Sequence, residues 1–280
     1  MRKLLINTAK IVAGTVVVVL ALLFFFQERL IYIPRPYPPG QVEQWITEPG
    51  TKLIPYQTAD GPQQAYLLSL SPNPKHLWVY CGGSGSRAIE LTDWLRGHAP
   101  KDDAWLMVDI PGYGTCAGSP SPDSIARSMR VAVPAAIAAL HWSPQESKGR
   151  LRFFGHSLGC AVCLIAAREN DIRSGVLMTP FTSAMEMSSV VTGIPLGFLV
   201  RHRFDNRARL MEIEAKGGGQ VIIVHGTSDE CIPIRMARSL QQSAPHTVHL
   251  TEIPGGKHLN LLDVAPGEVE KALRQISDAS

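Results

Sequence analysis

The longest apolar stretch of the chain lies close to its N-terminus. Residues 11–26 are all apolar apart from Gly14 and Thr15, and a mostly apolar segment reaches back to residue 4. A helix that crosses a bilayer needs ~20 predominantly apolar residues, whereas the core of a signal peptide has only ~7–15. No small-residue cleavage site follows the run. We therefore expect residues 1–27 to form an uncleaved transmembrane anchor rather than a signal peptide that is removed.

The charges on either side of this segment indicate its orientation. Arg2, Lys3 and Lys10 precede the apolar run, while Arg29 and Arg35 follow it. Basic residues are enriched on the cytoplasmic side of membrane helices. This modest bias predicts a single-pass anchor with the N-terminus inside and the remaining chain on the non-cytoplasmic side.

A proline-rich connector, residues 28–51, is expected to follow the anchor. Proline fixes φ and has no N–H to donate, so we expect residues 27–40 to form neither a helix nor a central strand. From the sequence, Leu30, Tyr32 and Ile33 could lie either at the bilayer interface or on the surface of the folded domain.

From residue 52 to residue 280, short apolar runs alternate with longer helix-compatible stretches. Two strands around the turn Ala-Asp-Gly-Pro, residues 59–62, predict an antiparallel hairpin. Buried strands are expected at residues 76–80, 104–109, 151–154, 174–179, 220–225 and 247–253. Helices are expected at residues 88–97, 123–141, 160–167, 233–243 and 266–277. This alternation predicts an α/β fold with a mostly parallel sheet, helices on both faces, and a site at the carboxyl ends of the strands.

One strand–helix junction has the pattern of a nucleophile elbow. Residues 155–159 read Gly-His-Ser-Leu-Gly, with an apolar run before them and a helix-compatible run after them. In such a turn Ser157 adopts a strained backbone conformation, and side chains two residues before or after it would clash with the strand and helix. The five-residue pattern alone occurs by chance, so its flanking strand and helix are what make it specific.

A serine nucleophile needs a histidine to accept its proton, and nine histidines are available. We predict His258 as the base, because it lies in the loop Gly-Gly-Lys-His after the last strand, at the edge where Ser157 is expected. His156, inside the elbow, and His225, at the end of a strand, are expected to be structural.

The histidine in turn needs a carboxylate to orient it. Asp229 is the predicted acid, because residues 225–229, His-Gly-Thr-Ser-Asp, carry it just past another strand end. Glu230 is the fallback. The chain order Ser157, Asp229, His258 is the order found in serine hydrolases whose nucleophile sits on such an elbow.

Two backbone N–H groups are expected to stabilise the negative charge of the tetrahedral intermediate. One belongs to Leu158, which follows the nucleophile at a helix N-terminus. The other is expected from the glycine-rich loop of residues 81–86, where we favour Gly83 as the second oxyanion-hole residue. The loop could instead be a flexible turn or a phosphate cradle, although no Gly-Lys-Ser/Thr sequence accompanies it. Asp109 is expected to be a turn residue rather than an alternative nucleophile.

The composition of the chain argues against several classes of binding partner. The 280 residues carry a net charge of +3 with no Lys/Arg cluster, which argues against nucleic acid. The five cysteines have neither a zinc-site spacing nor the density of a disulfide framework. Cys160 and Cys163 are expected to be small buried side chains rather than a redox pair. The sequence therefore predicts no metal and no cofactor.

Taken together, these motifs resemble the α/β-hydrolase superfamily, and specifically its small, membrane-anchored, lid-poor members, over residues 52–276. The family order is a glycine-rich oxyanion loop, D-x-x-G-Y-G, G-H-S-L/M-G, H-G-x-x-D and G-x-x-H. The chain supplies these motifs in the same order at residues 81–85, 109–114, 155–159, 225–229 and 255–258. Cys81 stands in place of a histidine that many members carry, and Pro111 in place of a commoner arginine. Neither change removes a backbone donor, but both affect the polarity expected near the substrate.

The resemblance implies hydrolysis of a carboxylic ester or thioester through an acyl-serine intermediate. Residues 181–219 occupy the position of the family's cap and are rich in apolar side chains. They could be helices that pack on the core or a small hydrophobic rim for an acyl chain. With the anchor, the rim would suit a small-molecule, acylated or lipid-derived substrate. Two alternatives stay open, which are a serine peptidase and a non-catalytic, membrane-tethered binding module. No propeller or large cap is present to select peptides.

Overall fold

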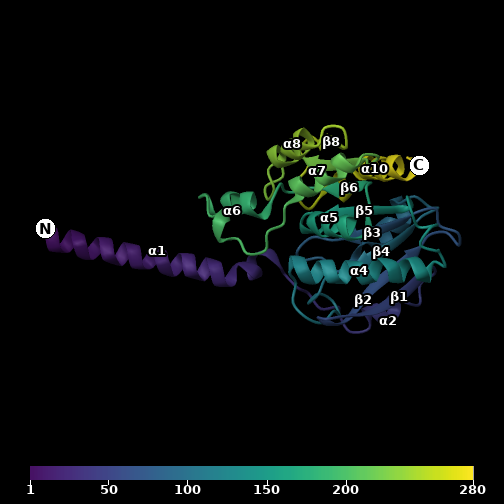
Figure 1. Ribbon diagram of the computed structural model, residues 1–280, viewed down its shortest axis with the longest axis horizontal. Coiled ribbons are helices and arrows are strands. Elements are labelled where there is room, and N and C mark those ends of the chain that lie inside the picture. The colour runs from purple at the N-terminus through teal and green to yellow at the C-terminus, as the bar shows by residue number, and fades with distance from the viewer. Residues whose placement is uncertain (280) are drawn as a thin grey trace.

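An eight-stranded sheet forms the centre of the molecule in the computed structural model, which describes residues 1–279 (Figure 1). The strands are β1 (Thr51–Thr58), β2 (Gly61–Ser69), β3 (Leu77–Cys81), β4 (Ala104–Val108), β5 (Leu151–His156), β6 (Gly175–Met178), β7 (Val221–Gly226) and β8 (Val248–Ile253). Their order is β1-β2-β4-β3-β5-β6-β7-β8. β1 and β2 form the predicted antiparallel hairpin, and β2 runs antiparallel to β4. The other six strands, β3 to β8, are all parallel to one another, which confirms the mostly parallel sheet.

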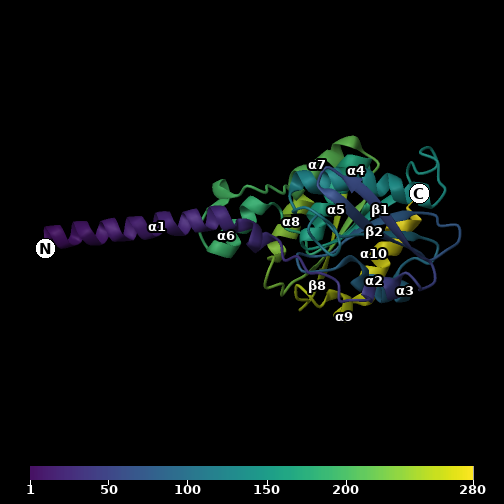
Figure 2. The ribbon, with the colours of Figure 1, turned by 90° about the horizontal axis from the view of Figure 1, so that it is seen from below.

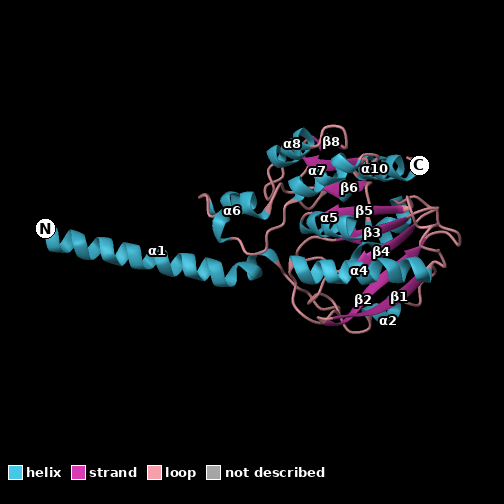
Figure 3. Cartoon of the chain, viewed as in Figure 1, coloured by secondary structure: helices cyan, strands magenta, loops and turns pink. Residues whose placement is uncertain are grey.

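Helices cover both faces of the sheet (Figure 3). One face carries α4 (Pro122–Ala139), α5 (Leu158–Asn170), α7 (Asn206–Lys216) and α8 (Ile234–Ser243). The other carries α2 (Gln41–Trp45), a 3-10 turn (Ala88–Leu91), α3 (Thr92–His98), α9 (Leu261–Val264) and α10 (Pro266–Asp278). Successive strand residues point to opposite faces of the sheet. Val79 of β3 therefore packs on the face that carries α4 and α5, while Trp78 and Tyr80 pack on the face that carries α3 and α10. Because both faces are covered, every residue of β3, β4, β6 and β7 is buried, which explains their continuous apolar sequences.

The N-terminal helix α1 (Arg2–Ile31) projects away from the sheet (Figures 1 and 2). It is the one helix among the described residues that is long and apolar enough to cross a membrane. The expectation that no helix includes residues 27–31 is wrong, because α1 continues to Ile31. The first proline of the connector is Pro34, and proline restricts only itself and the residue before it. Helix formation up to Ile31 is therefore allowed, and the chain becomes extended at Tyr32.

The connector packs on the domain rather than extending freely. Tyr32 is 4% exposed, its hydroxyl lies 3.0 Å from His202 Nδ1, and its ring stands edge-on to Phe204. Tyr32 therefore occupies the domain surface, whereas Leu30 and Ile33 remain exposed.

The stretch predicted as a cap divides into two parts. α6 (Ala184–Thr192) and a short 3-10 turn (Gly197–Leu199) project from the body of the domain, whereas α7 packs on α5 and α8. α7 therefore agrees with one of the two possibilities left open for residues 181–219, which is a helix that packs on the core. Its start and end follow local signals, since the Asp205 side chain accepts from the Ala208 N–H at the N-cap and Gly217 adopts a positive φ at the C-cap.

Candidate active site

Ser157 lies in the tight turn between β5 and α5. Its backbone has φ 54° and ψ −119°, a combination that non-glycine residues rarely adopt. The flanking glycines allow the turn because a Cβ on Gly159 would lie 2.0 Å from the Cys81 carbonyl oxygen, and one on Gly155 would lie 2.7 Å from the Cys160 Cα. The junction thus has the geometry of a nucleophile elbow, as the sequence predicted.

The structure brings the three predicted triad residues together. His258 Nε2 lies 3.0 Å from Ser157 Oγ, and His258 Nδ1 lies 2.9 Å from Asp229 Oδ2. Asp229 follows β7 and His258 follows β8, which are neighbouring parallel strands, so both loops leave the same edge of the sheet. The Ser228 N–H donates to the Gly256 carbonyl at 3.0 Å and ties the two loops to each other. Glu230, the fallback acid, is exposed, and Asp229 is the carboxylate bonded to His258.

The Asp229 carboxylate is held from several directions. Its Oδ1 accepts from the N–H groups of Ile232 at 2.7 Å and Cys231 at 2.9 Å, and its Oδ2 lies 3.3 Å from His225 Nε2. Burial alone would raise the pKa of Asp229, but hydrogen bonds from His225, His258 and the Ile232 N–H outweigh it and hold the pKa well below its ordinary value. The carboxylate is therefore ionised wherever His258 could act as a base.

His225 contacts the predicted acid, a role that the sequence did not reveal. It is fully buried, and its Nε2 also lies 2.8 Å from the Ile232 carbonyl. Because a carbonyl only accepts, Nε2 carries the proton and can share it with Asp229. The four-residue spacing of His225 and Asp229 is the signal in the sequence that could have indicated this contact.

His156 lies beside His258. Its Nε2 is 3.1 Å from the His258 carbonyl oxygen, so the ring donates there and holds the backbone of His258. Burial lowers the pKa of His156 to about 4, which keeps this ring neutral at neutral pH. The structural role predicted for His156 agrees with this contact.

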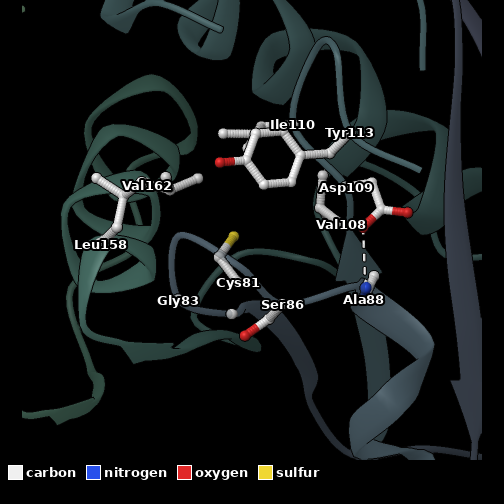
Figure 4. A pocket seen from close by; sticks show the side chains of 11 residues that line it. Cys81, Gly83, Ser86, Ala88, Val108, Asp109, Ile110, Tyr113, Leu158 and Val162 are labelled. Carbon is white, nitrogen blue, oxygen red and sulfur yellow. Dashed lines mark hydrogen bonds between the residues drawn. The ribbon is translucent and has the colours of Figure 1, made fainter. Parts of the chain in front are cut away.

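The predicted oxyanion-hole residues border a pocket beside the elbow. Leu158 is the first residue of α5, and Gly83 lies close to Ser157, since a Cβ added to Gly83 would be 3.6 Å from Ser157 Cβ. Figure 4 shows this pocket, with Cys81 and Gly83 on one side, Leu158 on another, and Tyr113 across from them. A second, mostly apolar pocket lies on the His258 side and is lined by His156, Leu259 and Leu262 among others.

Asp109 also borders the first pocket but serves the framework. Its Oδ2 accepts from Tyr37 Oη at 2.6 Å. Its Oδ1 accepts from the Ala88 N–H at 2.9 Å (Figure 4). Burial raises the pKa of Asp109 to about 6. These contacts agree with the expectation that Asp109 is not the nucleophile.

The connector after α1 binds directly to the glycine-rich loop. The Ile33 N–H donates to the Ser84 carbonyl at 3.0 Å, and Arg35 Nη1 donates to the Gly85 carbonyl at 3.1 Å. Tyr113 joins the two segments, because its hydroxyl donates to the Ser84 carbonyl at 2.7 Å and lies 2.9 Å from the Ile33 N–H. The loop that carries Gly83 is therefore held by residues outside the sheet.

Tyr113→Phe is expected to lower kcat for an activated ester by roughly fivefold to tenfold, the effect of about one net hydrogen bond. KM should change less than kcat, because phenylalanine keeps the ring that lines the pocket and loses only the hydroxyl that holds the Gly83 loop. Steady-state kinetics and thermal unfolding of both proteins check this. Equal losses for Tyr113→Phe and Tyr56→Phe, a buried tyrosine hydroxyl that lies 2.6 Å from Ser128 Oγ, would indicate a general loss of stability instead.

Asp229, Cys231 and His258 also place potential metal-ligand atoms within 4.8 Å of one another. Two of these three residues already bond to each other and, through His258, to Ser157. The exposed Cys231 adds one thiol to this pair. These contacts are the ones expected for the predicted triad, and we do not assign the three residues to a metal. The buried Cys160 and Cys163 thiols point to the carbonyls of Met178 and Phe154, as expected for small core side chains.

Comparison with known proteins gives relatives at low identity. No family model matches the chain. An uncharacterized protein of Mycobacterium tuberculosis is 28% identical over 241 residues, covering 83% of this chain and 80% of the relative. The alpha/beta hydrolase domain-containing protein WAV2 of Arabidopsis thaliana is 26% identical over 275 residues, covering 88% and 86%.

Solved structures match over most of the chain. The alpha-beta hydrolase from Vibrio vulnificus has a TM-score of 0.68 at 16% identity and covers 89% of this chain and 92% of its own. The esterase Pf2001 from Pyrococcus furiosus has a TM-score of 0.64 at 13% identity and covers 88% and 96%. The chain has the α/β-hydrolase fold.

Proposed function

We propose that the protein is a serine hydrolase that cleaves carboxylic esters or thioesters, with Ser157, His258 and Asp229 as its catalytic triad. The observation that carries this proposal is the chain of contacts from Asp229 through His258 to Ser157 at a strained elbow. An acid with a fully buried side chain, a base within hydrogen-bond reach and a pre-set nucleophile are the groups that acyl transfer requires.

In the first half-reaction, Ser157 Oγ attacks the acyl carbonyl carbon while His258 Nε2 takes the hydroxyl proton. The negative charge on the carbonyl oxygen is stabilised by the N–H groups of Leu158 and Gly83. The bond from the acyl carbon to the alcohol oxygen or thiol sulfur then breaks, and His258 returns the proton to that leaving group. In the second half-reaction, water repeats these steps on the acyl-serine and releases the acid.

The substrate that we propose is an acylated or lipid-derived molecule. Two features support this class. One is the apolar pocket beside His258, and the other is the α1 helix, which is followed by Ile33, a residue bonded to the glycine-rich loop after β3. We propose that α1 remains as a single-pass membrane anchor, with the folded domain on the non-cytoplasmic side, in line with the basic residues that precede its apolar run. A peptide substrate has no corresponding support among the described residues.

Labelling of Ser157 by a fluorophosphonate probe tests the proposed mechanism. The probe should phosphonylate the full-length protein in detergent, and Ser157→Ala should abolish labelling because no other described serine lies in an elbow with a paired histidine. Ser84→Ala, in the glycine-rich loop, is a matched control that keeps Ser157 and should still be labelled. A folded protein that resists the probe would instead be a membrane-tethered binding module. A panel of esters, thioesters and peptides would then define the substrate.

A further inference from the structure

The tip of the cap is a surface without charge. Residues 187–200, here called the cap tip, read Met-Ser-Ser-Val-Val-Thr-Gly-Ile-Pro-Leu-Gly-Phe-Leu-Val and contain no Asp, Glu, Lys or Arg. Three of its large apolar side chains are well exposed, with Val191 at 69%, Ile194 at 52% and Phe198 at 66%. Contiguous apolar side chains on a surface usually mark a binding face.

The cap tip is attached to the end of α1. The Gln27 side chain donates to the Leu199 carbonyl at 3.1 Å and accepts from the Arg201 N–H at 2.7 Å, and Gln27 itself is only 8% exposed. The Arg201 guanidinium lies 3.3 Å from the Glu28 carboxylate and 5.7 Å from the centre of the Phe24 ring. The cap tip and the last turns of α1 are therefore bound as a unit.

This attachment fixes the depth of the cap tip relative to α1. The apolar run of α1 ends at Phe26, one residue before Gln27. If α1 spans a bilayer, Gln27 lies at the boundary between hydrocarbon and headgroups, and Leu199 must lie at the same level. α6 projects from the domain on the same side as α1 (Figures 1 and 2), so the cap tip extends toward the bilayer.

Basic side chains occupy the level just outside this boundary. Arg29 on α1 and Arg203 after the cap tip are exposed, and neither has an acidic partner among the salt bridges of the described residues. An apolar face followed by basic residues is the arrangement of segments that lie in a membrane interface, where arginine meets lipid phosphates.

We propose that the cap tip is a second membrane contact, inserted into the interfacial layer of the bilayer that holds α1. Its occupant is lipid rather than a protein, because the C-terminal end of the cap tip is bound to the end of an apolar helix of membrane-spanning length. The inference rests on the proposed function only through the retention of α1. It deepens that function, since α6 follows β6 at the carboxyl edge of the sheet, so the edge that carries Ser157 faces the bilayer and an acyl chain can enter from it.

Depth-dependent quenching tests the insertion without requiring any hydrolysis. Full-length Phe198→Trp is reconstituted in phosphatidylcholine–phosphatidylglycerol vesicles whose acyl chains are brominated near the headgroup or near the bilayer centre. Its added fluorescence, relative to the unsubstituted protein, should be quenched more by the shallow bromines than by the deep ones. Met211→Trp is the matched control, because Met211 is 49% exposed on α7 and should not be quenched.

Three results would overturn the proposal. If the added fluorescence of Phe198→Trp is quenched by aqueous iodide and not by brominated lipid, the cap tip faces water or a protein partner. If that fluorescence changes with protein density and not with bromine, a second copy covers the cap tip. If the unsubstituted chain does not float with vesicles, α1 is not an anchor and the cap tip has no bilayer to enter. None of these results depends on whether Ser157 is catalytic, so failure of the hydrolase proposal is seen separately in probe labelling.

A double variant checks the consequence for substrate access. Val191→Ser with Phe198→Ser should lower turnover of a long-chain ester dissolved in vesicles roughly tenfold, the factor expected when a large apolar side chain loses its burial. Turnover of a short, water-soluble ester should stay unchanged, because neither residue belongs to the triad or its pockets. Equal losses on both esters would contradict the proposed role of the cap tip.

Discussion

Replacing His258 by alanine is expected to lower kcat/KM for an ester substrate by about 10⁴-fold or more. Without the imidazole, Ser157 Oγ loses its general base at 3.0 Å and the leaving group loses its proton donor. Steady-state or single-turnover kinetics on the detergent-solubilised protein measure the effect. The residual rate should still exceed that of water, because the N–H groups of Leu158 and Gly83 remain in place.

A matched histidine provides the control for this variant. His249 is exposed on β8, away from the elbow, and His249→Ala should retain the full turnover rate. Thermal unfolding of both variants separates lost chemistry from lost folding. A loss of only a few fold in His258→Ala would mean that another group acts as the base. His156 would then be the first candidate, since its ring centre lies 5.4 Å from that of His258.

Asp229→Asn is expected to reduce kcat by about 10⁴-fold while leaving KM nearly unchanged. An asparagine side chain can present its amide N–H₂ to His258 Nδ1, which would favour the tautomer that carries its proton on Nε2. That tautomer cannot accept the proton of Ser157. Kinetics of Asp229→Asn beside Glu230→Gln decide between the two neighbouring acids. A large loss in Glu230→Gln with a small one in Asp229→Asn would transfer the role of the acid to Glu230.

The difference in free energy of unfolding between the native protein and Asp229→Asn should depend on pH. The sign of this dependence follows from the lowered pKa of Asp229. An acid whose pKa is lower in the folded than in the unfolded protein stabilises the fold at pH values above the unfolded pKa, ~3.9 for Asp. That contribution is lost as pH falls through the folded pKa. The difference in free energy of unfolding between the native protein and Asp229→Asn should therefore be constant from pH 7 to about 5 and shrink below about 4. Urea unfolding at several pH values measures it.

The elbow and the triad residues could be located from sequence because each lies at the end of an apolar strand. In a parallel sheet such ends meet at one edge, so Ser157, Asp229 and His258 had to be neighbours once the strands were assigned. The steric need for Gly155 and Gly159 was also visible, because the pattern itself encodes the turn.

Contacts between distant segments were not predictable in the same way. Nothing in the local sequence of Gln27 indicates that its amide binds the Leu199 carbonyl 172 residues later. The contact of His225 with Asp229 depends on a turn whose shape the spacing alone does not determine. The bounds of α7 were not predictable for a different reason. Only Asn206, Leu210 and Ile213 of its eleven residues are buried, so its apolar face is too narrow to stand out from the surrounding polar sequence.

The hydrogen bonds between the connector and the glycine-rich loop affect where the chain should be shortened to produce a protein without α1. A chain that starts at residue 52, at the beginning of the compact domain, would lack Ile33, Arg35 and Tyr37, and with them the bonds to Ser84, Gly85 and Asp109. A chain that starts at Glu28 removes the apolar run of α1 and keeps all three residues. A shortened chain for expression and crystallisation should therefore begin at the start of the connector, residues 28–51, and not at its end.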